Sequence, residues 1–415
     1  MRSRTTALTA LMLAFPLITA CGAGAGATRT ANGTTRTQPV SFELPAPTGR
    51  QAIGTTELHL VDQARRDPWV KGKARELMIS VWYPARASTL PRAPYLRPTV
   101  ARLAGQAEAF GIFKPGQVDW AGARTHAAEA APADLRRGPR PVVLYSPGFG
   151  VPRAVGTTAV EELVSRGYVV VTMDHTYETS LVEFPTGRVE QQTLPPQSPA
   201  RTRTALDTRV ADTRFVLDRL AALRAGHNPD AERRRLPRGI GAALDLSRIG
   251  AFGHSAGGIQ AAEAMRVDRR LDAGIDLDGT MQYAPGDLVQ VARTGLDRPF
   301  MLMGAATGGE LQTHLTNPSW GSFWNNSRGW KRDLNVPQGS HYSFTDLQAI
   351  LPAVGRQTEL PADRAKDFVG TVDAGRMVAS QRVYVTAFFD RHLRRLPRPV
   401  LNGPSPQHPD FRFIR

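Results

Sequence analysis

The sequence predicts an α/β fold with a mostly parallel central sheet, antiparallel strands at its N-terminal side and helices on both faces. Two observations predict it. From residue 140 onward, short runs of Val, Ile, Leu and Met alternate with longer helix-favouring segments, which is typical of parallel strands joined by crossover helices. Before residue 85, three strand-like runs follow one another through short connections, which favours antiparallel pairing.

The elements follow from these patterns in chain order. Expected strands span residues 40–44, 56–61, 77–83, 142–146, 168–173, 247–252, 273–275, 300–303 and 334–336. Residues 85–139 are mixed in composition and are expected to contribute a helix, at 100–110, over a cleft. A helix is expected at 158–166 and a long one at 204–223, whose Arg and Asp side chains we expect to be solvated.

Composition excludes some classes of function. The chain has 415 residues, 41% of them hydrophobic, and a formal net charge of +15. The basic residues are almost all arginine and are scattered along the chain, without a helix-turn-helix, RNA-binding or zinc-finger motif. We therefore expect no nucleic-acid partner, and the positive charge is more consistent with attraction to an anionic lipid surface.

The N-terminus predicts export and a lipid anchor. Arg2 and Arg4 precede a short apolar run that ends in Ile-Thr-Ala-Cys at residues 18–21, an arrangement that resembles a bacterial lipobox. We expect residues 1–20 to be a signal peptide, Cys21 to be lipidated, and residues 21–39 to form a flexible tether. An ordinary secretory signal with an incidental cysteine is the alternative. The chain is thus expected outside the cytoplasm, anchored to the outer face of the cell membrane or secreted.

One catalytic domain is expected at 40–400, followed by a C-terminal tail at 401–415. Its central motif is Gly-His-Ser-Ala-Gly at residues 253–257, which fits the nucleophile-elbow pattern G-x-S-x-G. A strand pattern precedes it and a small-residue helix pattern follows it, as this turn requires. The motif predicts an α/β-hydrolase fold with Ser255 as nucleophile.

Ser255 needs a base and an acid, which follow it in this order: Ser, acid, His. Among the later histidines we prefer His341, which follows the last expected strand, to His314. The acid is either Asp278, at the end of the strand after the elbow, or Glu310, after the next strand; the residues alone leave both open. Asp276 lies on the same face of its strand as Asp278.

Two other motifs resemble sites of different chemistry. Residues 276–280 read Asp-Leu-Asp-Gly-Thr, which opens a haloacid-dehalogenase-type phosphatase site, but the later acidic metal-binding pair is missing. Residues 174–178, Asp-His-Thr-Tyr-Glu, lack the spacing of a metal site, and we expect them to line the substrate side of the cleft. No metal and no cofactor are expected.

An oxyanion hole needs two backbone N–H donors. The amide after the nucleophile belongs to Ala256, and the loop Ser-Pro-Gly-Phe-Gly at residues 146–150 is placed to supply the second, from Phe149.

These motifs resemble the plasma-type platelet-activating-factor acetylhydrolases and their bacterial relatives. The resemblance runs in motif order from about Leu77 to Asp346, through the elbow at 245–258, Gly-Ile-Asp-Leu-Asp at 274–278 and Gly-Ser-His at 339–341. It implies Asp278 as the triad acid and supports His341. The loop at 146–150 departs from the family, because Pro147 stands where a histidine is usual.

The resemblance implies a metal-independent serine esterase that acts on short sn-2 acyl groups of phospholipids. The residues themselves indicate only the esterase machinery. The alternatives are an esterase for other small acyl esters or polyesters, of the cutinase kind, and a binding lipoprotein without catalysis on the same fold.

Overall fold

The computed structural model describes residues 38–307 and 309–415. The expected signal peptide, Cys21 and the tether up to residue 37 therefore lie outside the described residues.

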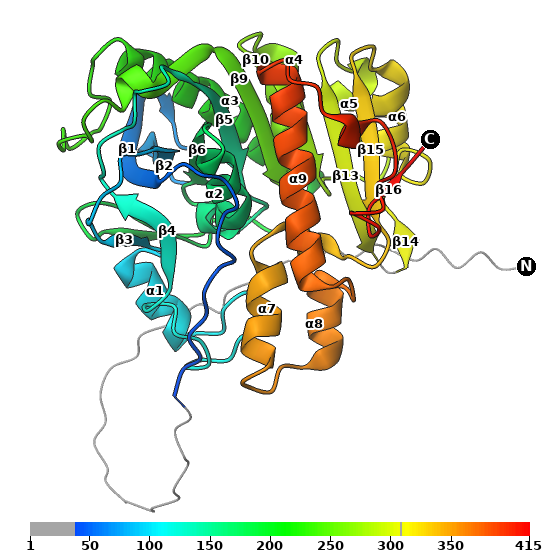
Figure 1. The fold of residues 1–415 in the computed structure, drawn as a ribbon, viewed down its shortest axis with the longest axis horizontal. Helices are drawn as coiled ribbons and strands as arrows, with labels where there is room; N and C mark the ends of the chain where they lie inside the picture. The colour runs from blue at the N-terminus through cyan, green and yellow to red at the C-terminus, as the bar shows by residue number, and fades with distance from the viewer. Residues whose placement is uncertain (1–37, 308) are drawn as a thin grey trace, which may run out of the picture.

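The fold is organised around one sheet of twelve strands (Figure 1). Along the sheet the strands stand in the order β16-β15-β13-β10-β9-β5-β6-β2-β1-β4-β3, with β14 paired to β13. The six strands from β15 to β6 are parallel, whereas β2 is antiparallel to both β6 and β1. The prediction of a mostly parallel sheet with antiparallel N-terminal strands is confirmed.

The strands of this sheet are β1 (Ile53–Arg66), β2 (Ala74–Pro84), β3 (Arg92–Pro94), β4 (Arg124–Glu129), β5 (Arg140–Ser146), β6 (Val169–His175), β9 (Leu244–His254), β10 (Leu271–Leu277), β13 (Phe300–Thr307), β14 (Glu310–Leu311), β15 (Lys331–Val336) and β16 (Arg412–Phe413). Two small hairpins stand apart from it, β7 (Leu181–Glu183) with β8 (Val189–Gln191), and β11 (Gln282–Ala284) with β12 (Asp287–Leu288).

The helices are α1 (Pro98–Gln106), α2 (Thr157–Ser165), α3 (Pro199–Arg224), α4 (Ala256–Val267), α5 (Gln290–Thr294), α6 (Pro318–Asn326), α7 (Leu347–Gly355), α8 (Ala362–Val369) and α9 (Ala374–Leu393). Four single 3₁₀ turns complete the described part, η1 (Arg153–Gly156), η2 (Gly241–Ala243), η3 (His341–Phe344) and η4 (Pro399–Leu401).

Alternate residues of each central strand enter different hydrophobic cores, because successive side chains of a strand point to opposite faces. In β5, Val142 and Leu144 belong to the core that includes residues of helices α3 to α6, whereas Val143 and Tyr145 belong to the core that includes residues of α2 and α9. Burial on both faces explains the unbroken apolar runs of these strands. In Figure 1, α9 crosses the face of the sheet that is turned toward the viewer.

A third hydrophobic core lies beyond the edge of the sheet at which the parallel strands end. It joins α1, α7 and α8, which lie near one another in Figure 1, to residues 40–44 and the segment before β4. Part of the expected cover at 85–139 is therefore helix α1, and part of it is strands β3 and β4 of the sheet itself.

Two segments differ from expectation. Residues 40–44 do not form a strand: Val40 makes a single bridge to Val118, and alternate residues are buried because the extended segment packs against the third core. The expected tail at 401–415 is docked instead of trailing. Phe411 is 2% exposed, and β16 pairs with β15, so apolar burial and strand pairing hold this end on the domain.

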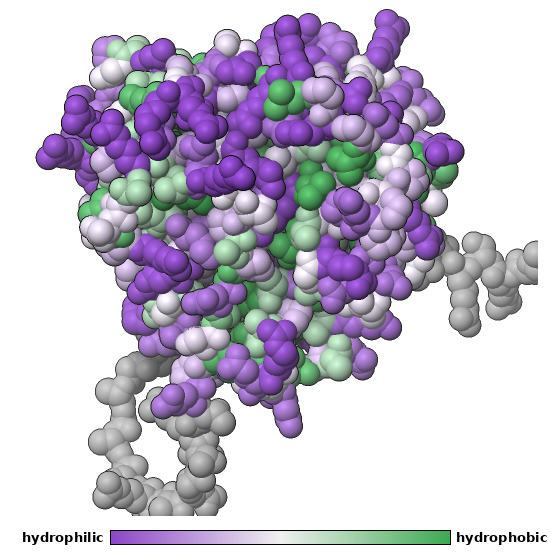
Figure 2. Space-filling model, viewed as in Figure 1, coloured by the Kyte–Doolittle hydropathy of each residue, from purple (hydrophilic) through white to green (hydrophobic). Residues whose placement is uncertain are grey.

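The surface in Figure 2 is mostly hydrophilic, with hydrophobic side chains in scattered patches. Within the described ranges, no helix combines the length and the apolar composition needed to cross a bilayer.

Candidate active site

Ser255 lies in the turn between β9 and α4, at the edge of the sheet where the parallel strands end. Its φ is +55°, a conformation that costs free energy for a residue with a side chain and that recurs at functional sites. The turn is crowded: a Cβ on Gly253 would lie 2.3 Å from the backbone of Gly257, and one on Gly257 would lie 1.9 Å from the Ser146 carbonyl oxygen. The two glycines of the motif are thus steric requirements.

The end of the neighbouring strand, β10, packs against this turn and bonds to it. The Ser255 N–H donates to the Leu277 carbonyl at 2.8 Å. Asp276 Oδ1 accepts the Gly279 N–H at 2.8 Å, and a Cβ on Gly258 would lie 1.8 Å from the same oxygen. Burial, reinforced by the charge of Asp278, raises the pKa of Asp276 well above its ordinary value. Burial thus favours the uncharged form of Asp276, which supports the turn through the Gly279 N–H.

Asp278 and His341 are brought together from strands that are distant in sequence. Asp278 Oδ2 lies 2.7 Å from His341 Nδ1, and Asp278 Oδ1 accepts the Ala305 N–H at 2.8 Å. The Asp278 side chain is 1% exposed and that of His341 is 33% exposed. A buried carboxylate that is fixed on one oxygen and bonded to Nδ1 on the other leaves Nε2 of the imidazole as the basic nitrogen.

The variable residue of the elbow motif, His254, supports the histidine loop. Its Nε2–H donates to the His341 carbonyl at 2.9 Å, and the two rings lie 4.5 Å apart. Burial, followed by the proximity of His341, lowers the pKa of His254 well below its ordinary value. A neutral His254 adds no positive charge next to His341.

The loop at residues 146–150 lies against the elbow. A Cβ on Gly148 would lie 3.3 Å from Ser255 Cβ, so the backbone of this loop comes close to the serine. In the part of the chain that the structure describes, the Phe149 N–H has no protein acceptor. Ala256 begins α4, and the first amide of a helix has no acceptor within that helix. Both amides are thus free to bind an oxyanion.

His314 and Glu310, the alternatives to His341 and Asp278, have other surroundings. His314 Nδ1 is 2.7 Å from Asp333 Oδ2, and its ring is stacked on Trp324 at 4.0 Å. Glu310 is exposed on β14.

The expectation that the charged side chains of the long helix are solvated is wrong for two residues of α3. Arg209 and Asp212 are buried. Asp212 contacts His175 at the end of β6, and Arg209 contacts Glu178 in the turn after it; both partners are also buried. Sequence reasoning missed Arg209 and Asp212 because Arg and Asp on an amphipathic pattern are usually exposed. The available indication was Asp174-His175 at a strand end, which offers charged partners.

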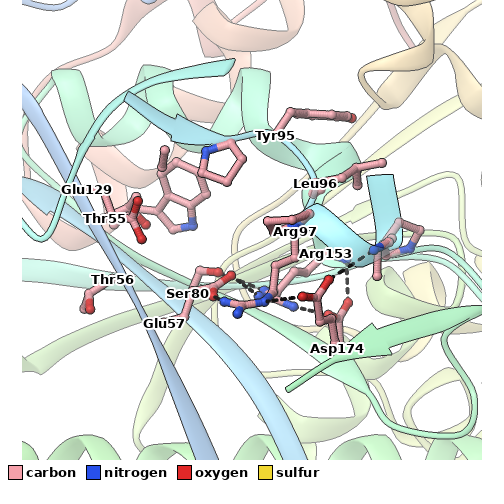
Figure 3. A pocket seen from close by; sticks show the side chains of 18 of the residues that line it. Thr55, Thr56, Glu57, Ser80, Tyr95, Leu96, Arg97, Glu129, Arg153 and Asp174 are labelled. Atoms are coloured by element: carbon pink, nitrogen blue, oxygen red, sulfur yellow. Dashed lines mark hydrogen bonds and ion pairs between the residues drawn. The ribbon is translucent and has the colours of Figure 1, made fainter. Parts of the chain in front are cut away.

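A cavity of about 300 Å³ lies against the loop that continues from Phe149, at residues 152–154. Figure 3 shows its charged wall, in which Arg153 pairs with Glu57 and Asp174, and Arg97 also contacts Glu57. Burial raises the pKa of Asp174, although Arg153 opposes this. Ser255 and His341 do not line this cavity, so it is distinct from the site at the elbow.

Comparisons with known proteins agree with this geometry. The family model described as platelet-activating factor acetylhydrolase, isoform II, matches residues 44–354. A probable 1-alkyl-2-acetylglycerophosphocholine esterase of Arthroderma benhamiae is 30% identical over 413 residues, covering 92% of this chain and 97% of that protein. Among solved structures, a ferulic acid esterase from Streptomyces cinnamoneus is 39% identical with a TM-score of 0.74, covering 90% of this chain and 99% of that chain.

The elbow, the strand order and these matches agree on an α/β-hydrolase fold and on the hydrolysis of carboxylic esters by a serine enzyme. The chain belongs to the platelet-activating factor acetylhydrolase isoform II family.

Proposed function

We propose that Ser255, His341 and Asp278 form the catalytic triad of this esterase. Ser255 Oγ attacks the ester carbonyl while His341 Nε2 takes the hydroxyl proton and later gives it to the leaving alcohol. Asp278 holds the Nδ1–H tautomer and stabilises the imidazolium. Water, activated by the same histidine, then releases the acyl group from Ser255. The hydrogen bond of 2.7 Å between Asp278 and His341 carries this assignment.

The oxyanion hole is proposed to consist of the N–H groups of Phe149 and Ala256. The carbonyl oxygen gains negative charge as the tetrahedral intermediate forms, and two free amides beside the serine stabilise that charge most in the transition state. The support is that both amides lack a protein acceptor and that the loop of Phe149 approaches Ser255.

As substrate we propose the short sn-2 acyl ester of a phospholipid, in line with the family and with the name of the relative from Arthroderma benhamiae, a probable 1-alkyl-2-acetylglycerophosphocholine esterase. A second candidate is the ester of an aromatic acid, because the ferulic acid esterase shares more of its sequence with this chain, 39% against 30%. Both substrates use the same catalytic residues and differ only in the acyl group and the alcohol.

The test is hydrolysis of p-nitrophenyl esters of increasing chain length, together with a 2-acetyl phospholipid and methyl ferulate, by the protein without residues 1–21. Activity on short acyl chains and on the 2-acetyl phospholipid supports the first substrate, and preference for methyl ferulate supports the second. Ser255→Ala is expected to abolish either activity. Activity that persists in Ser255→Ala contradicts the mechanism, and no activity on any ester by folded protein favours a binding protein.

We further propose that Cys21 is lipidated and holds the enzyme at the outer face of the cell membrane. The support is the lipobox-like sequence at residues 18–21 and the polar linker after it. In cells given an alkyne-labelled fatty acid, the full chain should be labelled and should sediment with membranes, and Cys21→Ala should lose both properties. A Cys21→Ala variant that still sediments with membranes would contradict the anchor.

A further inference from the structure

A second Ser–His–Asp chain lies inside the domain, behind the loop of the oxyanion hole. Ser146 Oγ is 2.7 Å from His175 Nε2, and His175 Nδ1 is 2.9 Å from Asp212 Oδ2. Ser146 is 4% exposed, and His175 and Asp212 are each 0% exposed. These are the residue types of a catalytic triad, but no ester can reach a serine enclosed in this way. The three hydrogen-bonded side chains must therefore have a structural role in the segments around them.

The charges of this buried cluster are balanced. Burial would raise the pKa of Asp212, but Arg75 and His175 hold it well below its ordinary value; Arg75 donates to both carboxylate oxygens, at 3.1 and 2.6 Å. Burial lowers the pKa of His175, and the charge of Arg209 lowers it further. An ionised Asp212 next to a neutral imidazole orients the His175 ring with Nδ1–H toward the carboxylate.

Arg209 connects this cluster to the oxyanion loop. Its Nη1 donates to the Pro147 carbonyl at 2.7 Å, and its Nη2 donates to the Gly148 carbonyl at 3.1 Å. Nη1 also lies 3.3 Å from Ser146 Oγ. The guanidinium is held in place by Glu178, which accepts from Nε at 2.9 and 3.0 Å and also contacts Nη2. A planar fork with both ends engaged has little freedom to rotate.

Because the peptide bond is planar, the hydrogen bond from Arg209 to the Gly148 carbonyl also fixes the orientation of the Phe149 N–H. The Gly148 carbonyl and the Phe149 N–H belong to one peptide unit, and in a trans peptide they point in opposite directions. A guanidinium that holds the carbonyl therefore turns the Phe149 N–H away from Arg209. Gly148 also lies close to Ser255, because a Cβ on Gly148 would lie 3.3 Å from Ser255 Cβ, so the peptide that carries the Phe149 N–H is near the serine.

We propose that Arg209 is a positioning residue for the oxyanion hole, acting through the carbonyls of Pro147 and Gly148 on the direction of the Phe149 N–H. This inference rests on the proposed function, because it presupposes that Phe149 donates to the oxyanion. Pro147 suits the arrangement: it has no N–H that would need an acceptor in the turn, and its carbonyl is free for Arg209.

A residue that orients an oxyanion donor should affect the stability of the transition state, and therefore kcat. Removal of one oxyanion-hole donor costs about 10²- to 10³-fold in kcat, and a misdirected donor loses part of that. The ground-state ester carbonyl carries less charge, so KM should change little.

The test compares Arg209→Lys with Arg382→Lys in the otherwise unchanged protein. Arg382 is a matched control: it is also buried and donates to the backbone carbonyls of Pro45 and Ala46, at 2.7 and 2.8 Å. A lysine keeps the charge opposite Glu178 but cannot hold two carbonyls in a planar fork. Active sites are titrated with a fluorophosphonate, and kcat per titrated site, KM and the Ki of a trifluoromethyl ketone are measured.

In Arg209→Lys we expect kcat per titrated site to fall about 10- to 100-fold, with KM within about 3-fold of wild type. The serine adduct of the ketone carries an oxyanion, so the Ki of the ketone should rise by the same factor. Arg382→Lys should stay within about 3-fold on every measure. A purely structural role of Arg209 would reduce the number of titratable sites and leave kcat per site unchanged, and that result overturns the proposal.

If Arg209→Lys does not fold, Glu178→Gln serves in its place, since it keeps the guanidinium and weakens only its anchor. A fall in kcat per site of about 3- to 10-fold, matched by the ketone, supports the proposal, and an unchanged kcat overturns it. Failure of the proposed function is seen separately, in wild-type protein that hydrolyses no ester or in active Ser255→Ala. Either result removes the reaction that Arg209 is proposed to serve.

Discussion

Replacing Asp278 with Asn tests the triad at the contact that the structure defines best. Asp278 Oδ1 accepts the Ala305 N–H, so the Asn side chain should keep its oxygen there and turn its NH₂ group toward His341 Nδ1. A donor at that position forces the proton onto Nε2. The imidazole would then meet the Ser255 hydroxyl with an N–H instead of a lone pair, and it could not act as base.

The size of the effect follows from this change of tautomer. A wrong tautomer in a Ser-His-Asp enzyme lowers kcat by about 10⁴-fold, which corresponds to about 5.5 kcal/mol of activation free energy. The fold should be retained, because Asn has the shape of Asp and the Ala305 hydrogen bond persists. We therefore expect Asp278→Asn to lose 10³- to 10⁴-fold in kcat on a p-nitrophenyl ester, with an unfolding transition close to that of wild type.

Asp276→Asn is the matched control. Asp276 lies two residues earlier, in β10, and is also buried. Burial raises the pKa of Asp276 well above its ordinary value, which favours the uncharged form, and Asn Oδ1 can still accept the Gly279 N–H. We expect kcat within about 3-fold of wild type. The reasoning is refuted if Asp278→Asn keeps more than a tenth of the wild-type kcat, or if Asp276→Asn falls as far as Asp278→Asn.

Three further predictions concern stability. Gly257→Ala should abolish activity or folding, because the new Cβ would lie 1.9 Å from the Ser146 carbonyl oxygen. Gly105→Ala, whose Cβ would have no atom within 4 Å, should raise the free energy of unfolding by up to about 1 kcal/mol in a denaturant titration. Equal effects of the two substitutions would contradict the steric argument. Burial lowers the pKa of His392 to about 4. Below about pH 6.5 the unfolded chain therefore binds a proton at His392 that the folded protein does not bind, and the free energy of unfolding falls between pH 6.5 and 4. Discounted for partial exposure this loss is about 2 kcal/mol, and His392→Phe should flatten the pH dependence of unfolding in that range; an unchanged slope would count against it. Phe411→Ala should destabilise the protein by about 3 kcal/mol in thermal unfolding because it empties a buried site at the docked C-terminus, and a loss below about 0.5 kcal/mol would mean that this end is not held in solution.

Much of the fold and of the site can be read from local patterns. The parallel strands are unbroken apolar runs because both of their faces are buried. The elbow can be recognised because glycines are needed within two residues of Ser255, where any Cβ meets backbone. These are constraints between neighbours in the chain, and a single sequence displays them directly.

Other features depend on partners that the chain does not place nearby. Residues 40–44 alternate like a strand, and only the third core shows that packing produced this pattern without a sheet neighbour. The residues at 401–415 look like a tail because β15, the strand with which β16 pairs, lies almost 80 residues earlier in the chain. An alternation of apolar residues records burial, and it does not record what buries them.

The candidate site divides in the same way. The sequence by itself determined the elbow, the order Ser, acid, His, and the preference for His341, because each follows from spacing along the chain. Only the tertiary structure decided that Asp278 Oδ2 meets His341 Nδ1. It also decided that Arg209, on a helix whose charged side chains were expected to be solvated, instead reaches the carbonyls of Pro147 and Gly148. The physical reason is that a buried charge is tolerated only where partners from other segments surround it, and those partners are assembled by the fold.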